Sequence, residues 1–131
     1  PGVNNEETRT GWNEGPCIIK YKGKYYLQYA APGTQYRIYG DGLYISDNPL
    51  GPFIKAGNNP VLEKNTAKGG EVTGTGHNMM FHSKDGEKMY TVYHGRTRKT
   101  GDERVVFIDE LKIDGKGVLS VDGPSTSEKE L

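Results

Sequence analysis

Tyr25-Tyr26-Leu27-Gln28-Tyr29 is the stretch of sequence that decides the fold. Its side chains alternate along an extended chain, so that Tyr25, Leu27 and Tyr29 share one face of a strand and Tyr26 and Gln28 share the other. The stretch returns as Met89-Tyr90-Thr91-Val92-Tyr93, with an offset of 64 residues (89 − 25). An alternating stretch that recurs predicts a β architecture built from a repeated unit.

Two further stretches recur at nearly the same distance. Leu43–Asp47 is echoed by Val105–Asp109, with an offset of 62 residues (105 − 43). Phe53–Lys55 is echoed by Val118–Ser120, with an offset of 65 residues (118 − 53). A period that stays nearly constant over three stretches indicates two copies of one unit.

Each copy is expected to form four short strands. These strands cover residues 16–21, 24–31, 41–47 and 52–56 in the first copy and 77–83, 88–95, 104–113 and 117–121 in the second. Glycine-containing turns such as Asp85-Gly86-Glu87 separate them, and no segment has a helical period. Four antiparallel strands in about 60 residues match the size of a propeller blade. The sequence therefore predicts an all-β chain, with blades over residues 12–57 and 74–122 and a C-terminal tail over 123–131.

The composition excludes several classes of function. The chain has 131 residues and a formal net charge of zero, so it offers no electrostatic basis for binding nucleic acid or an anionic membrane. No apolar run approaches the roughly 20 residues of a membrane-spanning helix. Cys17 is the single cysteine, which rules out an internal disulfide. The compartment stays open between extracellular, periplasmic and cytoplasmic.

Two blades do not close a propeller, because a closed ring takes at least four. An open pair would expose apolar faces and unpaired strand edges. We therefore expect the chain either to associate with missing N-terminal blades or to complete the ring as a homo-oligomer. A stable monomer of this chain alone in sedimentation would contradict that expectation.

Glu14 and His77 are the candidate site residues, and each lies where a loop leads into the first predicted strand of a blade. Glu14 lies in Trp12-Asn13-Glu14-Gly15-Pro16, and His77 follows Gly74-Thr75-Gly76. Innermost strands of neighbouring blades meet at a central cavity, so both side chains would lean into it. Desolvation beside Trp12 would raise the pKa of Glu14 and suit a general acid, whereas the simpler interpretation is a solvated glutamate before a turn. His77 would bind a metal, hold a catalytic carboxylate or fill a polar plug.

Arg96 and Arg98 follow the strand that ends in Tyr93-His94-Gly95. A guanidinium there could bind sugar hydroxyls or a carboxylate through paired hydrogen bonds. The simpler interpretation of both is a surface arginine.

Taken together, several motifs resemble glycoside hydrolase family 43. The matching stretches run in family order over about 110 residues: Glu14-Gly15-Pro16, Ser46-Asp47-Asn48-Pro49-Leu50-Gly51-Pro52-Phe53, Gly74-Thr75-Gly76-His77-Asn78, Tyr93-His94-Gly95-Arg96 and Asp122-Gly123-Pro124-Ser125. The resemblance implies the last two blades of a five-bladed propeller that cuts arabinose- or xylose-containing polysaccharides or oligosaccharides with inversion.

The resemblance also implies roles for single residues. Glu14 matches the general acid, and Arg96 or, as a second choice, Arg98 matches an arginine that contacts the sugar. Trp12, beside Glu14 in the sequence, is assigned to substrate binding as well, independently of the resemblance. His77 matches a histidine near the propeller axis, where a calcium ion is expected in some members, although no cofactor is required. The general base and the aspartate that tunes the acid come from earlier blades and have no matching position here. We therefore expect little or no activity from this chain alone, and the alternatives are a non-catalytic sugar-binding or protein-interaction half-propeller.

Overall fold

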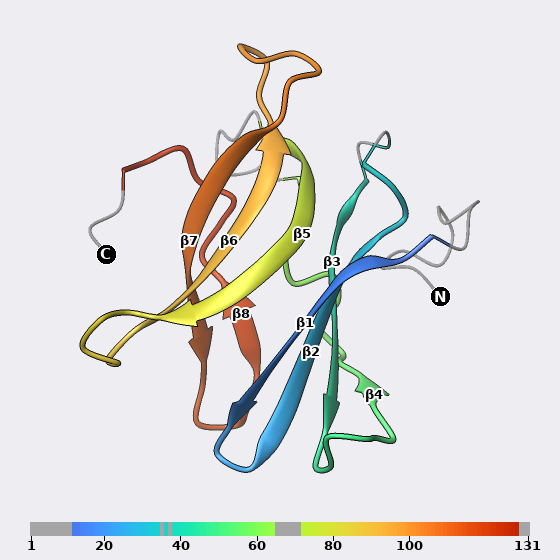
Figure 1. Cartoon of the computed structure of the whole chain (residues 1–131), viewed down its shortest axis with the longest axis vertical. Coiled ribbons are helices and arrows are strands. Elements are labelled where there is room, and N and C mark those ends of the chain that lie inside the picture. Colours follow the sequence, from blue (N-terminus) through green and yellow to red (C-terminus); the bar gives the residue numbers. More distant parts are fainter. Residues whose placement is uncertain (1–11, 35, 37, 65–71, 129–131) are drawn as a thin grey trace.

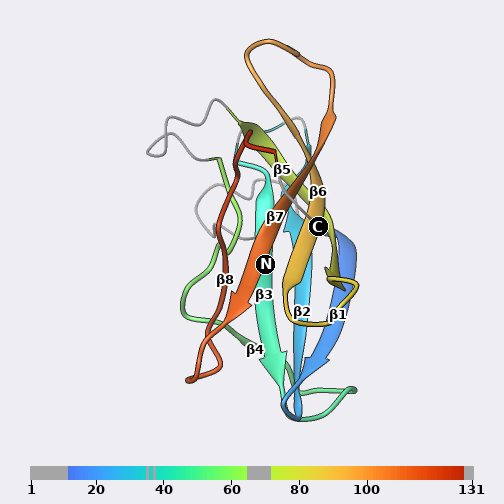
Figure 2. The same cartoon turned by 90° about the vertical axis from the view of Figure 1, so that its left-hand side faces the viewer.

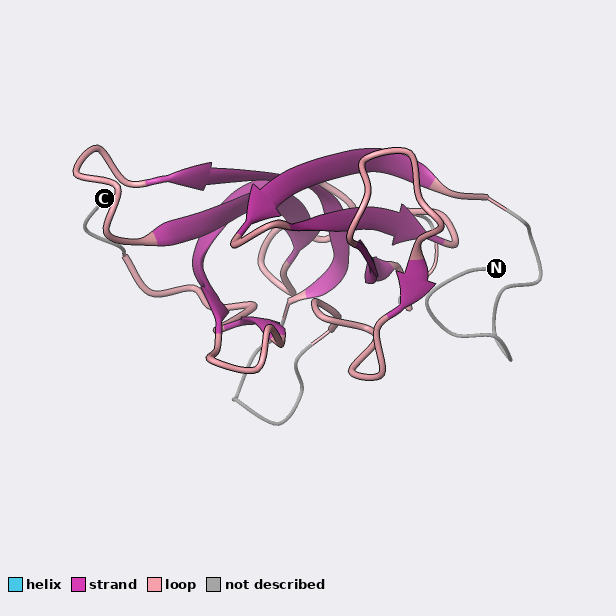
Figure 3. Ribbon diagram, turned by 90° about the horizontal axis from the view of Figure 1, so that it is seen from below, coloured by secondary structure: helices cyan, strands magenta, loops and turns pink. Residues whose placement is uncertain are grey.

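The computed structural model describes residues 12–34, 36, 38–64 and 72–128. The strands are β1 (Glu14–Tyr21), β2 (Lys24–Ala31), β3 (Gly40–Ser46), β4 (Ile54–Lys55), β5 (Thr73–His82), β6 (Met89–Arg96), β7 (Val105–Ile113) and β8 (Leu119–Val121). No helix occurs in the described residues, and hence none that is long and apolar enough to cross a membrane (Figure 3). The predicted all-β class is confirmed.

The strands form two sheets of four, in the orders β1-β2-β3-β4 and β5-β6-β7-β8 (Figure 1). Every pairing is antiparallel, and each strand pairs with the next one along the chain. This is the meander predicted for each repeat. We call the two sheets the first blade and the second blade. The first strands of the two sheets, β1 and β5, contact each other where the sheets meet (Figure 1). Figure 2 shows the same two sheets turned by 90°.

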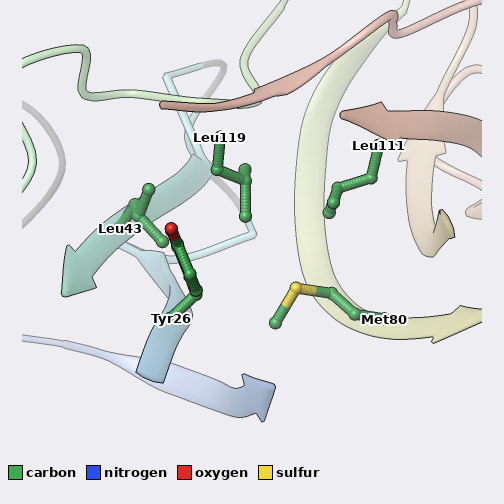
Figure 4. Packing of buried hydrophobic residues seen from close by; sticks show 5 residues of the cluster. All are labelled: Tyr26, Leu43, Met80, Leu111 and Leu119. Carbon is green, nitrogen blue, oxygen red and sulfur yellow. The ribbon is translucent and has the colours of Figure 1, made fainter. Parts of the chain in front are cut away.

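An apolar core joins the two blades. Tyr26 and Leu43 come from the first blade, and Met80, Leu111 and Leu119 come from the second (Figure 4). All five side chains are at most 6% exposed. The hydroxyl of Tyr26 also donates a hydrogen bond of 3.1 Å to the carbonyl of Gly117 in the other blade. Fully burying one such side chain stabilises a fold by about 1.5–3 kcal/mol, so this interface is a main source of the chain's stability.

A polar layer lies between the blades beside the apolar core. The side-chain amide of Asn78 donates to Gln28 Oε1 at 2.9 Å and to Thr91 Oγ1 at 3.3 Å. All three side chains are buried. The layer links β2, β5 and β6, and its hydrogen bonds favour one relative placement of the two blades.

β1 and β5 both begin earlier than predicted, at Glu14 and Thr73. Their first residues were expected to be loop because Gly and Pro weaken a strand. The chain instead keeps pairing through bulges, with register shifts between Glu14 and Cys17 and on both sides of Gly76. Pro16 has no N–H to donate, so a bulge at that point loses no ladder hydrogen bond.

The pairing register corrects one of the three sequence echoes. Tyr25 pairs with Ser46 in the first blade, and Met89 pairs with Leu111 in the second. Ser46 therefore corresponds to Leu111, an offset of 65 residues (111 − 46), and not to Ile108 as the echo implied. The match between Leu43–Asp47 and Val105–Asp109 was wrong by three residues, because similar alternating side chains concealed a shift along the strand.

The start of the predicted tail is packed against the second blade. Ser125 donates its backbone N–H to Asp109 Oδ2 at 3.0 Å and its hydroxyl to Asp109 Oδ1 at 2.5 Å. Pro124 is buried. The segment after β8 thus closes over β7, and residues 129–131 of the predicted tail lie outside the described part of the chain.

Candidate functional site

The structure brings Glu14 and His77 together, as their places on adjoining inner strands led us to expect. His77 Nδ1 lies 3.6 Å from Glu14 Oε1. The same oxygen accepts a hydrogen bond of 2.5 Å from the hydroxyl of Tyr39, and Oε2 accepts one of 2.8 Å from the indole N–H of Trp12. The carboxylate of Glu14 is therefore held by groups from both blades.

Two glycines make this meeting of side chains possible. A Cβ on Gly15 would lie 2.9 Å from the Cα and ring atoms of His77. A Cβ on Gly76 would collide with the ring of Tyr39. Gly15, which follows Glu14, thus leaves space for His77. Gly76, which precedes His77, leaves space for Tyr39. Both His77 and Tyr39 contact the carboxylate of Glu14. The Glu-Gly and Gly-His dipeptides are parts of one packing arrangement.

His77 also has an unusual backbone conformation. Its φ is +56°, in the left-handed region that non-glycine residues rarely adopt. Gly15 has a φ of +57°. Such a conformation costs a non-glycine residue of order 1–3 kcal/mol. Among the described residues Lys22, in the turn between β1 and β2, is the other non-glycine residue with a positive φ, and His77 differs from it in lying within a strand. The bulges of β5 on either side of Gly76 hold His77 in this conformation.

The electrostatics of Glu14 differ from the prediction. Burial raises its pKa, but the hydrogen bonds from Trp12 and Tyr39 and the proximity of His77 outweigh burial and bring the pKa below its ordinary value. The predicted rise was wrong because desolvation beside Trp12 was considered without the donors. Hydrogen bonds to a carboxylate favour its charged form.

Tyr39 and His94 lie behind the carboxylate and were not identified from sequence. Their rings stack with centroids 5.6 Å apart and planes 8° from parallel. Burial and the neighbouring Glu14 raise the pKa of Tyr39 far above its ordinary value, which keeps the hydroxyl protonated and able to donate. Burial, and next the charge of Arg104, lower the pKa of His94 to about 4, so its imidazole is neutral at pH 7. His94 was part of a recognised motif, whereas Tyr39 was not.

Trp12 contacts the carboxylate of Glu14. Its side chain donates to Glu14 yet remains 60% exposed, so that an indole face is open beside the carboxylate. An aromatic face of this kind can stack on an apolar face of a bound molecule. Its assignment to substrate binding stays a prediction.

Arg96 is held between the blades. Its Nη1 donates to the carbonyl of Thr34 at 2.8 Å and to Thr34 Oγ1 at 2.9 Å, and its Nε donates to the carbonyl of Asp102 at 3.0 Å. Thr34 belongs to the connection between β2 and β3, so the guanidinium ties the second blade to the first. A substrate contact by Arg96 would have to use its remaining N–H groups.

The loop between β6 and β7 carries two further arginines. Arg98 is exposed in this loop. Arg104, at the end of the loop, is also exposed, and its Nη1 lies 3.5 Å from His94 Nε2. The structure therefore places Arg104 next to the ring that stacks on Tyr39. Sequence reasoning missed Arg104, since it is separated from the Tyr93-His94-Gly95-Arg96 motif by the loop.

A calcium site at His77 finds little support among the described residues. No group of three or more His, Cys, Asp or Glu side chains that could hold a metal is found within them. Calcium takes six to eight oxygen ligands, whereas His77 offers a nitrogen and has Glu14 as its acidic neighbour. The residues described here do not fit a calcium ion by themselves, and the ion stays a prediction.

Comparisons with known proteins agree on one family. The model of the family "Glycosyl hydrolases family 43" matches residues 1–119. A β-D-galactofuranosidase of Aspergillus niger is 36% identical over 116 residues, covering 87% of this chain and 33% of that protein. An arabinoxylan arabinofuranohydrolase of Paenibacillus polymyxa is 39% identical over 89 residues, covering 64% of this chain and 13% of that protein.

Solved structures show the same relationship. A thermostable family-43 glycoside hydrolase is 41% identical, with a TM-score of 0.77. The match covers 91% of this chain and 38% of the hydrolase chain. An endo-1,4-β-xylanase from Bacteroides thetaiotaomicron is 34% identical, with a TM-score of 0.76. The match covers 86% of this chain and 38% of the xylanase chain. The two blades correspond to part of the five-bladed propeller, and the chain spans between 13% and 38% of the length of these relatives. This chain belongs to glycosyl hydrolase family 43.

Proposed function

We propose that this chain is part of an inverting glycoside hydrolase in which Glu14 is the general acid. The observation that carries the proposal is the position of the carboxylate. Glu14 is 25% exposed in its side chain and lies at the junction of the two inner strands, with the open indole of Trp12 on one side and His77 on the other. The carboxyl of Glu14 is shielded enough for its neighbours to shift its pKa, and it is exposed enough to contact a bound molecule.

In the proposed reaction Glu14 gives its proton to the bridging oxygen as the glycosidic bond breaks. Positive charge then builds on the sugar ring, and a water attacks from the opposite face. That water needs a carboxylate base, for which the family resemblance finds no position in this chain. Trp12 would bind the sugar by stacking, and Arg96, Arg98 and Arg104 would supply donors around it.

The lowered pKa of Glu14 supports the need for groups outside this chain. A general acid must hold its proton at the working pH, and the donors that contact Glu14 in this chain favour the charged form instead. A second carboxylate close by would raise the pKa again by like-charge repulsion. We infer that the tuning carboxylate comes from the part of the propeller that precedes these blades.

The curated relatives favour a furanose sugar. Their names are β-D-galactofuranosidase, arabinoxylan arabinofuranohydrolase and exo-α-(1→5)-L-arabinofuranosidase. Arabinose- and xylose-containing glycans were expected from the sequence, and within that pair we propose arabinofuranosyl groups as the first choice and xylosyl groups as the second.

The open face of the second blade supports association with further blades. Cys17 and Met79 hold corresponding positions, because Cys17 pairs with Gln28 and Met79 with Val92. Cys17 packs against the core between the blades, whereas Met79 is 64% exposed on the far side of the second blade. Val106 on the same face is 71% exposed. We propose that the N-terminal blades of a complete propeller cover this face, and a homo-oligomer is the alternative.

A chimera tests the proposed function. The segment of the thermostable family-43 hydrolase that matches this chain would be replaced by residues 1–131, so that its own upstream blades supply the missing carboxylates. We expect the chimera to hydrolyse an aryl α-L-arabinofuranoside or an aryl β-D-xyloside, and Glu14→Gln to lower kcat by roughly 10²–10⁴, as for loss of a general acid.

The isolated chain and its Glu14→Gln variant are the controls, and both are expected to be inactive. Equal activity of the chimera with and without Glu14→Gln would contradict the role of Glu14. Turnover by the isolated chain that disappears in Glu14→Gln would show instead that these two blades are catalytically complete. Glycan binding in calorimetry by a folded chimera that never hydrolyses would favour the sugar-binding alternative.

A further inference from the structure

Tyr39 is the group in this site that neither the sequence motifs nor the proposed reaction accounts for. It lies in the connection just before β3, and it is 0% exposed. Its hydroxyl donates to Glu14 Oε1 at 2.5 Å, a short hydrogen bond to a carboxylate. A buried tyrosine that donates to a candidate catalytic carboxylate can orient it as well as stabilise the fold.

We propose that Tyr39 is a positioning residue for Glu14, fixing Oε1 toward the protein interior and leaving Oε2, beside the indole of Trp12, as the oxygen that carries the transferable proton. This inference rests on the proposed role of Glu14 as an acid. The two carboxylate oxygens have different surroundings. Oε1 accepts from the buried hydroxyl and lies near His77, whereas Oε2 accepts from the exposed Trp12 side chain.

The ring of Tyr39 is fixed on two sides. Its Cε1 lies against Gly76, where any Cβ would collide with it, and its face stacks on His94. A ring held by packing spends little conformational freedom on the hydrogen bond that it makes, so the hydroxyl is preorganised. Gly76 and His94 of the second blade thus fix the ring of Tyr39, and Tyr39 in turn orients the carboxylate of Glu14.

Other charged and titratable groups surround this hydrogen bond. His77 on β5 contacts Glu14. His94 on β6 stacks on Tyr39, and Arg104, in the loop just before β7, acts on both Tyr39 and His94. Asp41 on β3 acts on Tyr39 from the interior. Because these groups stay in place when the hydroxyl alone is removed, Tyr39→Phe isolates the contribution of one donor.

The test is a ¹³C NMR titration of the Glu14 carboxyl in the complete 131-residue chain, with Glu14→Gln used to assign the signal. We expect Tyr39→Phe to move the midpoint of Glu14 to higher pH, since a donor to the charged form is lost. Tyr93→Phe is the matched control. It removes another buried tyrosine hydroxyl that donates to a carboxylate, Asp109, at 2.5 Å, and it should leave the Glu14 midpoint unchanged.

A second measurement on the unaltered chain covers the case in which Tyr39→Phe does not fold. The ¹³Cζ signal of Tyr39 should titrate with the midpoint of Glu14 and lose that step in Glu14→Gln. A folded Tyr39→Phe variant with an unmoved midpoint, an equal shift in Tyr93→Phe, or a Tyr39 signal that ignores Glu14 would each overturn the proposal. None of these readouts needs turnover, so this failure is distinct from an inactive chimera.

Discussion

Glu14-Gly15 in the first blade and Gly76-His77 in the second are the same structural position with the side chains exchanged. Glu14 pairs with Ala30 and Gly76 pairs with His94, at the corresponding places in the two ladders. Gly15 and His77 then share nearly the same left-handed φ, +57° and +56°. One blade offers the carboxylate and the other the imidazole, and the glycine beside each leaves room for its partners.

The difference between Glu14-Gly15 and Gly76-His77 shows how two copies of a repeated unit can place different side chains next to each other. Two identical blades would place a glutamate against a glycine, or a glycine against a histidine, at this junction. Divergence at two adjacent positions instead gives a carboxylate with a neighbouring imidazole, on a backbone that both blades share. Each blade also buries one aspartate at a different position of its ladder, Asp41 in the first blade and Asp109 in the second, and both are 0% exposed but have opposite surroundings.

The largest stability effect is expected from the core that joins the blades. Leu43→Ala in the first blade and Leu111→Ala in the second should each lower the free energy of unfolding by about 2–5 kcal/mol, as for other buried leucines. Because both side chains fill one interface, near-UV and far-UV circular dichroism should report a single transition in urea for either variant. Leu50→Ala, at a side chain that is 94% exposed, is the control and should change little. Two separate transitions would show that the blades fold independently.

Exchanging each buried aspartate for asparagine should have opposite effects in the two blades. Asp109 accepts hydrogen bonds from the hydroxyl of Tyr93 and from both the N–H and the hydroxyl of Ser125. Asp109→Asn puts an amide donor against these donors and should cost roughly 1–3 kcal/mol. Among the described residues, only the backbone N–H of His77 acts on the carboxylate of Asp41, at a geometry outside that of a good hydrogen bond. Because burial disfavours the charge of this carboxylate, Asp41→Asn should stabilise the chain by about 1–2 kcal/mol at pH 7.

The pH dependence separates these two effects. Burial raises the pKa of Asp41 well above its ordinary 3.8, although the backbone N–H of His77 acts in the opposite direction. The unfolded chain therefore releases this proton at lower pH than the folded chain, and folding stability falls as pH rises above about 4. Urea titrations should show the gain from Asp41→Asn growing between pH 4 and pH 7. A gain that stayed constant with pH would show that Asp41 is charged in the folded chain.

Sequence reasoning recovered the local pattern well and the contacts across the interface poorly. The strands followed from alternation and glycine turns, and the meeting of Glu14 with His77 followed from their equivalent places where a loop leads into the first strand of a blade. Tyr39 could not be found this way, because its role depends on a ring fitting where Gly76 lacks a side chain. The pKa of Glu14 was predicted in the wrong direction for the same reason, since the donors that lower it come partly from such contacts. The three-residue error in the echo at Val105–Asp109 reflects how little alternation alone says about register.

The smallest expected effect concerns His94, which stands where the first blade has Ala30. Burial and Arg104 lower its pKa to about 4 from an ordinary 6.5, so the unfolded chain takes up a proton between these values and the folded chain does not. The stability that His94 contributes is therefore complete above pH 6.5 and is lost as pH falls toward 4. His94→Ala makes this position resemble the first blade and should flatten that part of the stability profile, in urea titrations best made in an Asp41→Asn background to remove the opposing slope. An unchanged slope would show that His94 becomes charged without cost, and that the stack on Tyr39 does not depend on a neutral ring.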